Sequence, residues 1–332
     1  GHARGAVIGS SLANIMSAAG YRVTREYYIN DAGNQMQLFF ESVLARYREL
    51  LGIPFELPEG GYQGDYIKDV AELVRSEFGD SLIDNSDAIN EMAQFSTDTM
   101  LNAISDDLCE LRVEFDNWFS EKSLFGSDEY TDTIGELESK SYLKEMDSAL
   151  WFVSTMLEEE KDNVIVKSTG EPTYFASDIA YHRNKFKTRE FDQVIDIWGA
   201  DHQGHISRLK AAMRALDIDD SKLKILISQM VTLKQGDEIV KASKRTGDFI
   251  TVKELVEEVG SDACRYFFLT RSASSQMEFD MELAKKTSNE NPVYYIQYAH
   301  ARIKNILALA SDNEIDWYQA DLSLLNNIHE LN

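Results

Sequence analysis

The sequence has only two cysteines and four prolines, and it contains no long run of apolar residues. Cys109 and Cys264 are far apart and form no C-x-x-C pair, which argues against a zinc ribbon or a disulfide framework and favours a reducing, cytoplasmic environment. No run reaches the roughly eighteen apolar residues of a membrane helix, and the first residues show no signal peptide. Because low-complexity segments are also absent, we expect the chain to fold throughout.

Basic residues are scarce relative to acidic ones. The 33 Lys and Arg residues face 57 Asp and Glu residues, which gives a formal net charge of −24. This charge repels polyanions at long range, so contact with a nucleic acid would need a local basic patch, whereas cationic ligands are favoured. A length of 332 residues predicts one large α/β domain and a smaller second one.

The central segment 164–208 predicts the floor of a ligand site. An apolar run at 194–198 ends at Gly199 and indicates a buried parallel strand, with a helical pattern after it. Open α/β sheets bind ligands at the carboxyl ends of their strands. Tyr174 and Asp178 lie at a second junction between a strand and a helix, so two polar clusters are expected to face one crevice. The cluster after the first strand comprises Asp201, His202, Gln203 and His205.

The rest of the chain alternates strand and helix patterns. Strands are predicted at 21–29, 113–119, 149–155, 164–167 and 224–234. Helical periodicity over about 36–111 is interpreted as an insertion in the sheet domain. Glu121 follows the second of these strands and could face a ligand. A long helix begins at Pro292, where a second, helical domain is expected to start.

Two segments could bind phosphate. His2 stands at the amino end of the first predicted helix, and helix amino ends attract anions. The basic segment 241–245 follows a buried strand and precedes a helix capped by Thr251, so its cations could hold a phosphate chain beside the same crevice.

Six segments in this order resemble bacterial arginyl-tRNA synthetases of class I. GHARGAV at 1–7 is similar to the second half of the HxGH motif, and KASKR at 241–245 is similar to the KMSKS loop. The other four are YYINDAGNQ at 27–35, FDNWFSE at 115–121, TYFASD at 173–178 and GADHQGH at 199–205. Two departures stand out: the first His of the HxGH motif is absent because the sequence starts after it, and Ala242 replaces the usual Met of the loop.

The resemblance implies a fold and an activity. The fold is α/β: a Rossmann-like parallel sheet forms a nucleotide-binding catalytic domain over 1–285, with the helical insertion at about 36–111, and 286–332 starts an all-α anticodon-binding bundle. The activity is that of an arginine–tRNA ligase, which activates L-arginine with ATP to arginyl-adenylate and transfers it to the terminal adenosine of tRNA(Arg). Mg²⁺ would arrive with ATP, no protein-bound zinc is expected, and the complete protein would be a cytoplasmic monomer.

The resemblance also assigns roles to residues. His2, Lys241, Lys244 and Arg245 would stabilise charge on the phosphates. The predicted ATP contacts are Gly1, His2, Gly199, Asp201, Lys241, Ser243 and Lys244. Glu121, Tyr174 and Asp178 would surround the guanidinium of arginine, and His202 and Gln203 would line the main-chain groups of the amino acid or the ATP ribose. Carboxylates suit a planar fork of N–H donors, which supports the guanidinium assignment.

Alternatives stay open at this point. Asp201, His202 and His205 could instead ligate a metal. The chain could be another HxGH nucleotidyltransferase, or a non-catalytic module that binds arginine or tRNA. We also expect the isolated 332-residue chain to bind arginine weakly, to leave tRNA uncharged and to self-associate through exposed bundle helices.

Overall fold

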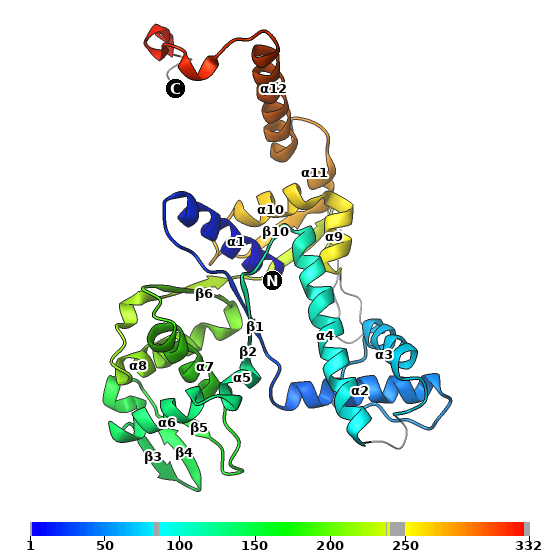
Figure 1. The fold of residues 1–332 in the computed structure, drawn as a ribbon, viewed down its shortest axis with the longest axis vertical. Helices are drawn as coiled ribbons and strands as arrows, with labels where there is room; N and C mark the ends of the chain where they lie inside the picture. The colour runs from blue at the N-terminus through cyan, green and yellow to red at the C-terminus, as the bar shows by residue number, and fades with distance from the viewer. Residues whose placement is uncertain (1, 83–85, 237, 240–249, 329–332) are drawn as a thin grey trace.

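The computed structural model describes residues 2–82, 86–236, 238–239 and 250–328. Its elements form three groups, with a last helix that projects from them (Figure 1). One group contains the central strands and the helices around them, the second contains the helices between the first two strands, and the third lies around the carboxyl-terminal helices. Within the described residues, no helix has both the length and the apolar character to cross a membrane.

Two pairs of parallel strands carry the predicted site. Strand β1 (Glu26–Ile29) pairs with β2 (Asn117–Ser120), and β6 (Val194–Gly199) pairs with β7 (Leu223–Ser228). Helix α1 (His2–Ala18) packs closely on β6, because a Cβ atom at Gly9 would lie 2.8 Å from Ile197 Cδ1. Glycine at this position therefore lets the helix approach the strand.

An antiparallel meander and three helices cover this part of the molecule. The meander comprises β3 (Leu143–Met146), β4 (Ala149–Phe152) and β5 (Asn163–Val166). The helices are α6 (Glu129–Ser139), α7 (Tyr174–Arg183), which continues as a π-helix over Asn184–Thr188, and α8 (Ile206–Ala215). They share a core with β6 and β7 that includes Phe152, Ile165, Ile179, Leu209 and Met213.

In the part of the predicted helical insertion that the structure describes, three helices share a core of their own. They are α2 (Asn34–Leu50), α3 (Asp65–Phe78) and α4 (Ser86–Glu110). Buried residues of this core include Val43, Tyr47, Ile67, Val74 and Met92. Figure 1 shows α4 running from this group to the carboxyl-terminal group, beside α9.

The third group combines short strands with the carboxyl-terminal helices of the described residues, the last of which projects from it. Strand β8 (Val231–Gln235) pairs in parallel with β10 (Met277–Asp280) and in antiparallel with β9 (Glu238–Ile239). The helices are α9 (Val252–Val259), α10 (Ser261–Leu269), α11 (Met281–Lys285) and α12 (Pro292–Asp312). Beyond α12, 3₁₀ turns cover Trp317–Gln319 and Leu322–Leu324.

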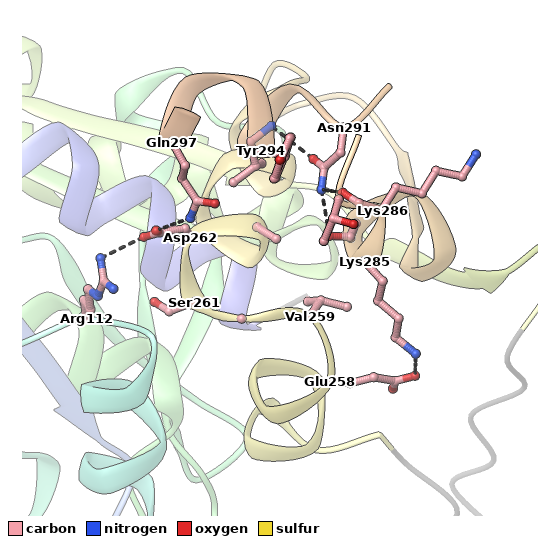
Figure 2. A pocket seen from close by; sticks show the side chains of 15 residues that line it. Arg112, Glu258, Val259, Ser261, Asp262, Lys285, Lys286, Asn291, Tyr294 and Gln297 are labelled. Atoms are coloured by element: carbon pink, nitrogen blue, oxygen red, sulfur yellow. Dashed lines mark hydrogen bonds and ion pairs between the residues drawn. The ribbon is translucent and has the colours of Figure 1, made fainter. Parts of the chain in front are cut away.

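A cavity of about 400 Å³ lies where α12 leaves the body. Figure 2 shows the Asp262 carboxylate at its wall, bridging Arg112 and Gln297. Both bridging hydrogen bonds measure 2.7 Å, so one carboxylate joins the segment just after α4 to the first turns of α12. Of the predicted site residues that the structure describes, none lines this cavity.

Several predicted strands are shorter than expected or divided. The segment 21–29 forms a strand only from Glu26, and 113–119 only from Asn117. The single strand predicted at 224–234 is wrong, because β7 pairs with β6 whereas β8 pairs with β10. The chain changes partner at Gln229, whose N–H donates to the carbonyl of Ala273.

Candidate active site

The amino end of helix α5 (Glu121–Gly126) is tied to the loop after β1. Asp31 in that loop accepts hydrogen bonds from Ser120 Oγ at 2.6 Å and from the Lys122 N–H at 2.9 Å. Ser120 also caps the helix, since its side chain accepts from the N–H of Ser123. The two motifs at 27–35 and 115–121 are thereby held together, although they are far apart in the sequence.

Glu121 is buried at the start of this helix. Only 3% of its surface is exposed, and its Oε2 atom has no hydrogen-bond partner among the residues that the structure describes. Burial raises the pKa of the Glu121 carboxyl group; the Ser177 and Tyr28 hydroxyls oppose that rise, and the charges of Asp178 and Asp31 add to it. A buried carboxylate oxygen without a partner is costly unless a ligand supplies the donor.

Helix α7 brings Tyr174 and Asp178 to the same place. Asp178 is partly buried and interacts electrostatically with Glu121, and burial raises the pKa of its carboxyl group. Tyr174 is 55% exposed, and its hydroxyl oxygen lies 3.8 Å from where a Cβ atom of Gly33 would stand. Gly33 has φ 82°, a conformation that favours glycine, so the start of α2 can lie close to this tyrosine.

Aromatic rings pack beside the carboxylates. The ring of Tyr181 lies 4.7 Å from that of Tyr28 and 4.6 Å from that of Phe119, measured between centroids. Burial raises the pKa of Tyr28, and the charges of Glu121 and Asp178 raise it further, so its hydroxyl stays protonated and can donate. The result is an apolar wall next to a pair of acids, an arrangement that suits a flat cationic group.

Three ionisable residues support the turn of α7 that carries Asp178, and the sequence analysis did not predict them. They are His182 on α7, Lys185 in the π-helical turn and Asp196 in the middle of β6. A usable signal was present, because Asp196 interrupts an apolar run that was predicted to be a buried strand, and a buried acid needs a partner. His182 and Lys185 follow Asp178 at helical spacing.

The predicted nucleotide residues lie at other strand and helix ends. His2 is exposed at the start of α1, and Gly199 ends β6. Asp201, His202 and Gln203 belong to a 3₁₀ turn, Ala200–His205, that leads into α8. Gly1 and the basic loop with Lys241, Ala242, Ser243, Lys244 and Arg245 lie outside the described residues.

The 3₁₀ turn is largely open. Asp201 Oδ2 lies 3.5 Å from His202 Nε2, and both side chains are exposed. Burial lowers the pKa of His205, and the nearby Arg208 and His202 lower it further. In the described part of the chain, no three His, Cys, Asp or Glu side chains are grouped so that they could hold a metal ion, and this includes Asp201, His202 and His205.

Comparisons with known proteins agree with this geometry. Residues 1–305 match the family described as tRNA synthetases class I (R), catalytic domain. The chain is 53% identical over 333 aligned residues to an arginine–tRNA ligase of Dehalococcoides mccartyi, and 50% identical over 337 to that of Carboxydothermus hydrogenoformans. Each alignment covers the whole of this chain and 60% of the relative, so the chain spans about three fifths of the length of these curated relatives.

Solved structures show the same similarity. The crystal structure of a Campylobacter jejuni protein assigned as an arginyl-tRNA synthetase superposes with a TM-score of 0.87 at 38% identity, over 98% of this chain and 72% of that one. A Thermus thermophilus arginyl-tRNA synthetase shares the fold, with a TM-score of 0.68 at 19% identity, over 100% of this chain and 65% of that one. The predicted mixed α/β fold class is confirmed, and the chain belongs to the class I (R) tRNA synthetase catalytic-domain family.

Proposed function

We propose that this chain is the catalytic part of an arginine–tRNA ligase. It would activate L-arginine with ATP to arginyl-adenylate and transfer the arginyl group to the terminal adenosine of tRNA(Arg). The observation that carries the proposal is the buried Glu121 carboxylate, whose Oε2 has no partner in the described part of the chain and which lies beside Asp178.

Two neighbouring acids fit a guanidinium better than an ammonium. A guanidinium presents N–H donors in a planar fork, which can engage Glu121 and Asp178 at once, whereas lysine offers one compact charge. Without a ligand, burial raises the pKa of both carboxyl groups. A bound guanidinium would favour the ionised forms of both carboxyl groups, and the ionised carboxylates in turn bind the guanidinium more tightly. Tyr174 would close one side, and His202 and Gln203 would contact the main-chain groups of the amino acid.

The reaction needs the arginine carboxylate in line with the α-phosphate of ATP. The carboxylate oxygen forms a bond to that phosphorus and pyrophosphate leaves; a ribose hydroxyl of the tRNA then attacks the carbonyl carbon and AMP leaves. His2 at the amino end of α1, together with Lys241, Lys244 and Arg245, would stabilise the charge that develops on the phosphates. Gly1, Gly199, Asp201 and Ser243 would complete the ATP contacts, and Mg²⁺ would enter with ATP.

The complete protein is proposed to act in the cytoplasm as a monomer, with tRNA(Arg), L-arginine and ATP as its partners. Residues 286–332 would begin the helical anticodon-binding domain, after a catalytic domain over 1–285. A general HxGH nucleotidyltransferase would have no use for a buried pair of acids, and a non-catalytic module would have none for the basic loop. The acid pair and the basic loop together therefore favour the ligase.

The substitution Asp178→Asn in the full-length protein tests the arginine site. It removes one charge-assisted contact and should weaken arginine binding by on the order of 2–4 kcal/mol, with ATP binding nearly unchanged. Isothermal titration of both ligands measures this. Asp192→Asn, at an exposed position, is the matched control and should leave both affinities unchanged. Equal weakening of arginine and ATP would point to a folding defect and sink the assignment.

A further inference from the structure

A buried cluster of charges supports the helix that carries Asp178. We call it the Asp196 cluster: Asp196 on β6, and His182 and Lys185 on α7 and its π-helical extension. Asp196 Oδ2 lies 2.6 Å from His182 Nε2, and its Oδ1 lies 2.9 Å from Lys185 Nζ. The side chains of His182, Lys185 and Asp196 are 2%, 9% and 10% exposed.

The cluster connects directly to the backbone of Asp178. The other ring nitrogen of His182, Nδ1, lies 2.7 Å from the carbonyl oxygen of Asp178. Both ring nitrogens therefore face oxygen acceptors, and both contacts are satisfied only when both nitrogens carry a proton. In that form the imidazole is a cation, and it joins the turn of Asp178 to the sheet.

The charges around Asp178 are of both signs. Asp196 on β6, Glu121 at the start of α5 and Asp31 in the loop after β1 are acidic, and Glu121 interacts electrostatically with both Asp178 and Asp31. His182, Lys185 and Arg208 are the positive groups, and Arg208 lies on α8 with its guanidinium 4.7 Å from the ring centroid of Phe175. With a doubly protonated His182, the Asp196 cluster carries one net positive charge, which offsets part of the acidic surroundings.

Packing alone does not account for this cluster. Removing three charged groups from water costs free energy that apolar side chains of similar volume would not cost. The chain also makes room for the contact, because α7 widens into a π-helix at Asn184–Thr188 and Lys185 Nζ comes to lie 3.9 Å from the centroid of the Tyr181 ring. The presence of charged side chains at these three buried positions therefore needs an explanation other than packing.

We propose that the Asp196 cluster is a specificity-determining support of the guanidinium site: it fixes the turn of α7 that carries Asp178 and supplies positive charge that offsets the acidic surroundings of the Asp178 carboxylate, so that this carboxylate can pair with a cationic ligand. His182, Lys185 and Asp196 are positioning residues and do not touch the ligand. The inference rests on the proposed arginine site. It explains how the protein would bind a guanidinium more tightly than a neutral group of the same shape.

The cluster predicts a defined pH dependence. Arginine binding requires an ionised Asp178, so affinity falls as the pH drops through the pKa of that group. Removal of a neighbouring positive charge raises this pKa, so the loss should begin at a higher pH. A protonated Asp178 is neutral, and discrimination between arginine and citrulline, its uncharged analogue, should shrink over the same range.

The test compares Lys185→Met with Lys185→Arg in the full-length protein. Dissociation constants for arginine, citrulline and ATP are measured by titration across pH 5–8. Lys185→Met should raise the midpoint of the pH-dependent loss of arginine binding by about one pH unit and reduce the preference for arginine over citrulline about tenfold at the lower pH values. Lys185→Arg keeps the charge, so both the midpoint and the preference for arginine over citrulline should stay near those of the unsubstituted protein. ATP binding should change less than about twofold in either variant.

A second variant and a control separate the outcomes. His182→Gln keeps an N–H donor for Asp196 but loses the cation and the contact with the Asp178 carbonyl, so it should move the midpoint in the same direction even where Lys185→Met folds poorly. Lys187→Met removes a lysine of the same turn that pairs with Glu136 instead, and it should leave the midpoint unchanged.

Different failures have different meanings. If the unsubstituted protein does not bind arginine, or if Asp178→Asn binds it equally well, the proposed function is wrong. If Asp178→Asn weakens arginine while Lys185→Met and His182→Gln leave the midpoint and the citrulline ratio unchanged, only the role of the Asp196 cluster is wrong. If Lys185→Met and Lys185→Arg have equal effects and weaken the binding of arginine and of ATP alike, the Asp196 cluster has a purely structural role. That result would also overturn its proposed role in specificity.

Discussion

Arg4, in the segment that resembles the HxGH motif, stabilises the fold. It lies on the first turn of α1 with none of its surface exposed. Its guanidinium donates five hydrogen bonds to backbone carbonyls that follow β7 or close the end of α10; these belong to Gln229, Phe268, Arg271, Ser272 and Ser275, at 2.7–3.3 Å. The amino end of α1, where His2 is proposed to meet ATP, is thereby anchored to two loops.

Arg4→Ala should destabilise the protein strongly. It leaves several buried carbonyls without donors and opens a cavity, which together should lower the free energy of unfolding by about 3–5 kcal/mol. Urea denaturation followed by circular dichroism measures the change. Arg22→Ala, at an exposed position, should cost less than about 0.5 kcal/mol. A small effect of Arg4→Ala on the free energy of unfolding would contradict this prediction and would mean that water can donate hydrogen bonds to these carbonyls in place of the guanidinium.

At the residue scale, the sequence predicts the acids that we propose to contact a ligand but not the residues that support them. Glu121, Tyr174 and Asp178 were predicted from motif resemblance, and the structure places Glu121 and Asp178 together. Asp31 and Asp196 act across elements, through hydrogen bonds from Ser120 and His182. Such partnerships depend on tertiary packing, which local periodicity does not encode.

At the element scale, a charged seam joins α6 to the π-helical end of α7. Glu136 on α6 pairs with Lys140, Arg183 and Lys187. Burial would raise the pKa of Glu136, but hydrogen bonds from these three cations lower it to about 2. The seam holds α6 against the same turn from which Lys185 reaches Asp196.

Glu136→Gln should remove an acid-sensitive part of the stability. The pKa of Glu136 falls from 4.5 when unfolded to about 2 when folded, so its contribution is fully present above pH 4.5 and is lost as the pH drops towards 2. After allowance for solvent screening, the variant should be less stable by about 1–2 kcal/mol at pH 6, and the difference should vanish near pH 2. Urea titrations at several pH values measure it. Glu138→Gln, exposed on the same helix, is the control, and a difference that persists at pH 2 would exclude the ionic origin.

Helices were easier to predict than strands at this scale. The helix capped by Thr251 is confirmed as α9, with the Thr251 side chain and Glu254 forming a capping box, because that signal lies within four residues. The division of 224–234 into β7 and β8 could not be predicted, since apolar residues recur along the whole segment and the two strands differ in their partners, β6 and β10.

At the scale of the whole molecule, apolar surface concentrates at the carboxyl-terminal end. Helix α12 projects from the body, as Figure 1 shows, and its side chains include several large apolar groups that are more than half exposed. These are Tyr295, Ile296, Ile303, Ile306 and Leu309, and Tyr318, Leu322 and Leu324 continue the surface in the tail. Exposed apolar surface of this extent favours association.

We therefore expect the 332-residue chain to self-associate through α12. Its net charge of −24 opposes contact between copies, so association should strengthen as salt screens that repulsion. Sedimentation velocity at rising concentration, in low and high salt, measures this. Ile303→Ser with Ile306→Ser removes two groups that are 57% and 61% exposed and should weaken association at least about tenfold. Leu73→Ser, at an exposed position on α3, is the matched control and should have no effect. If the double variant associates as strongly as the parent chain, another surface must hold the copies together, and if salt weakens the association, charge pairing must do so.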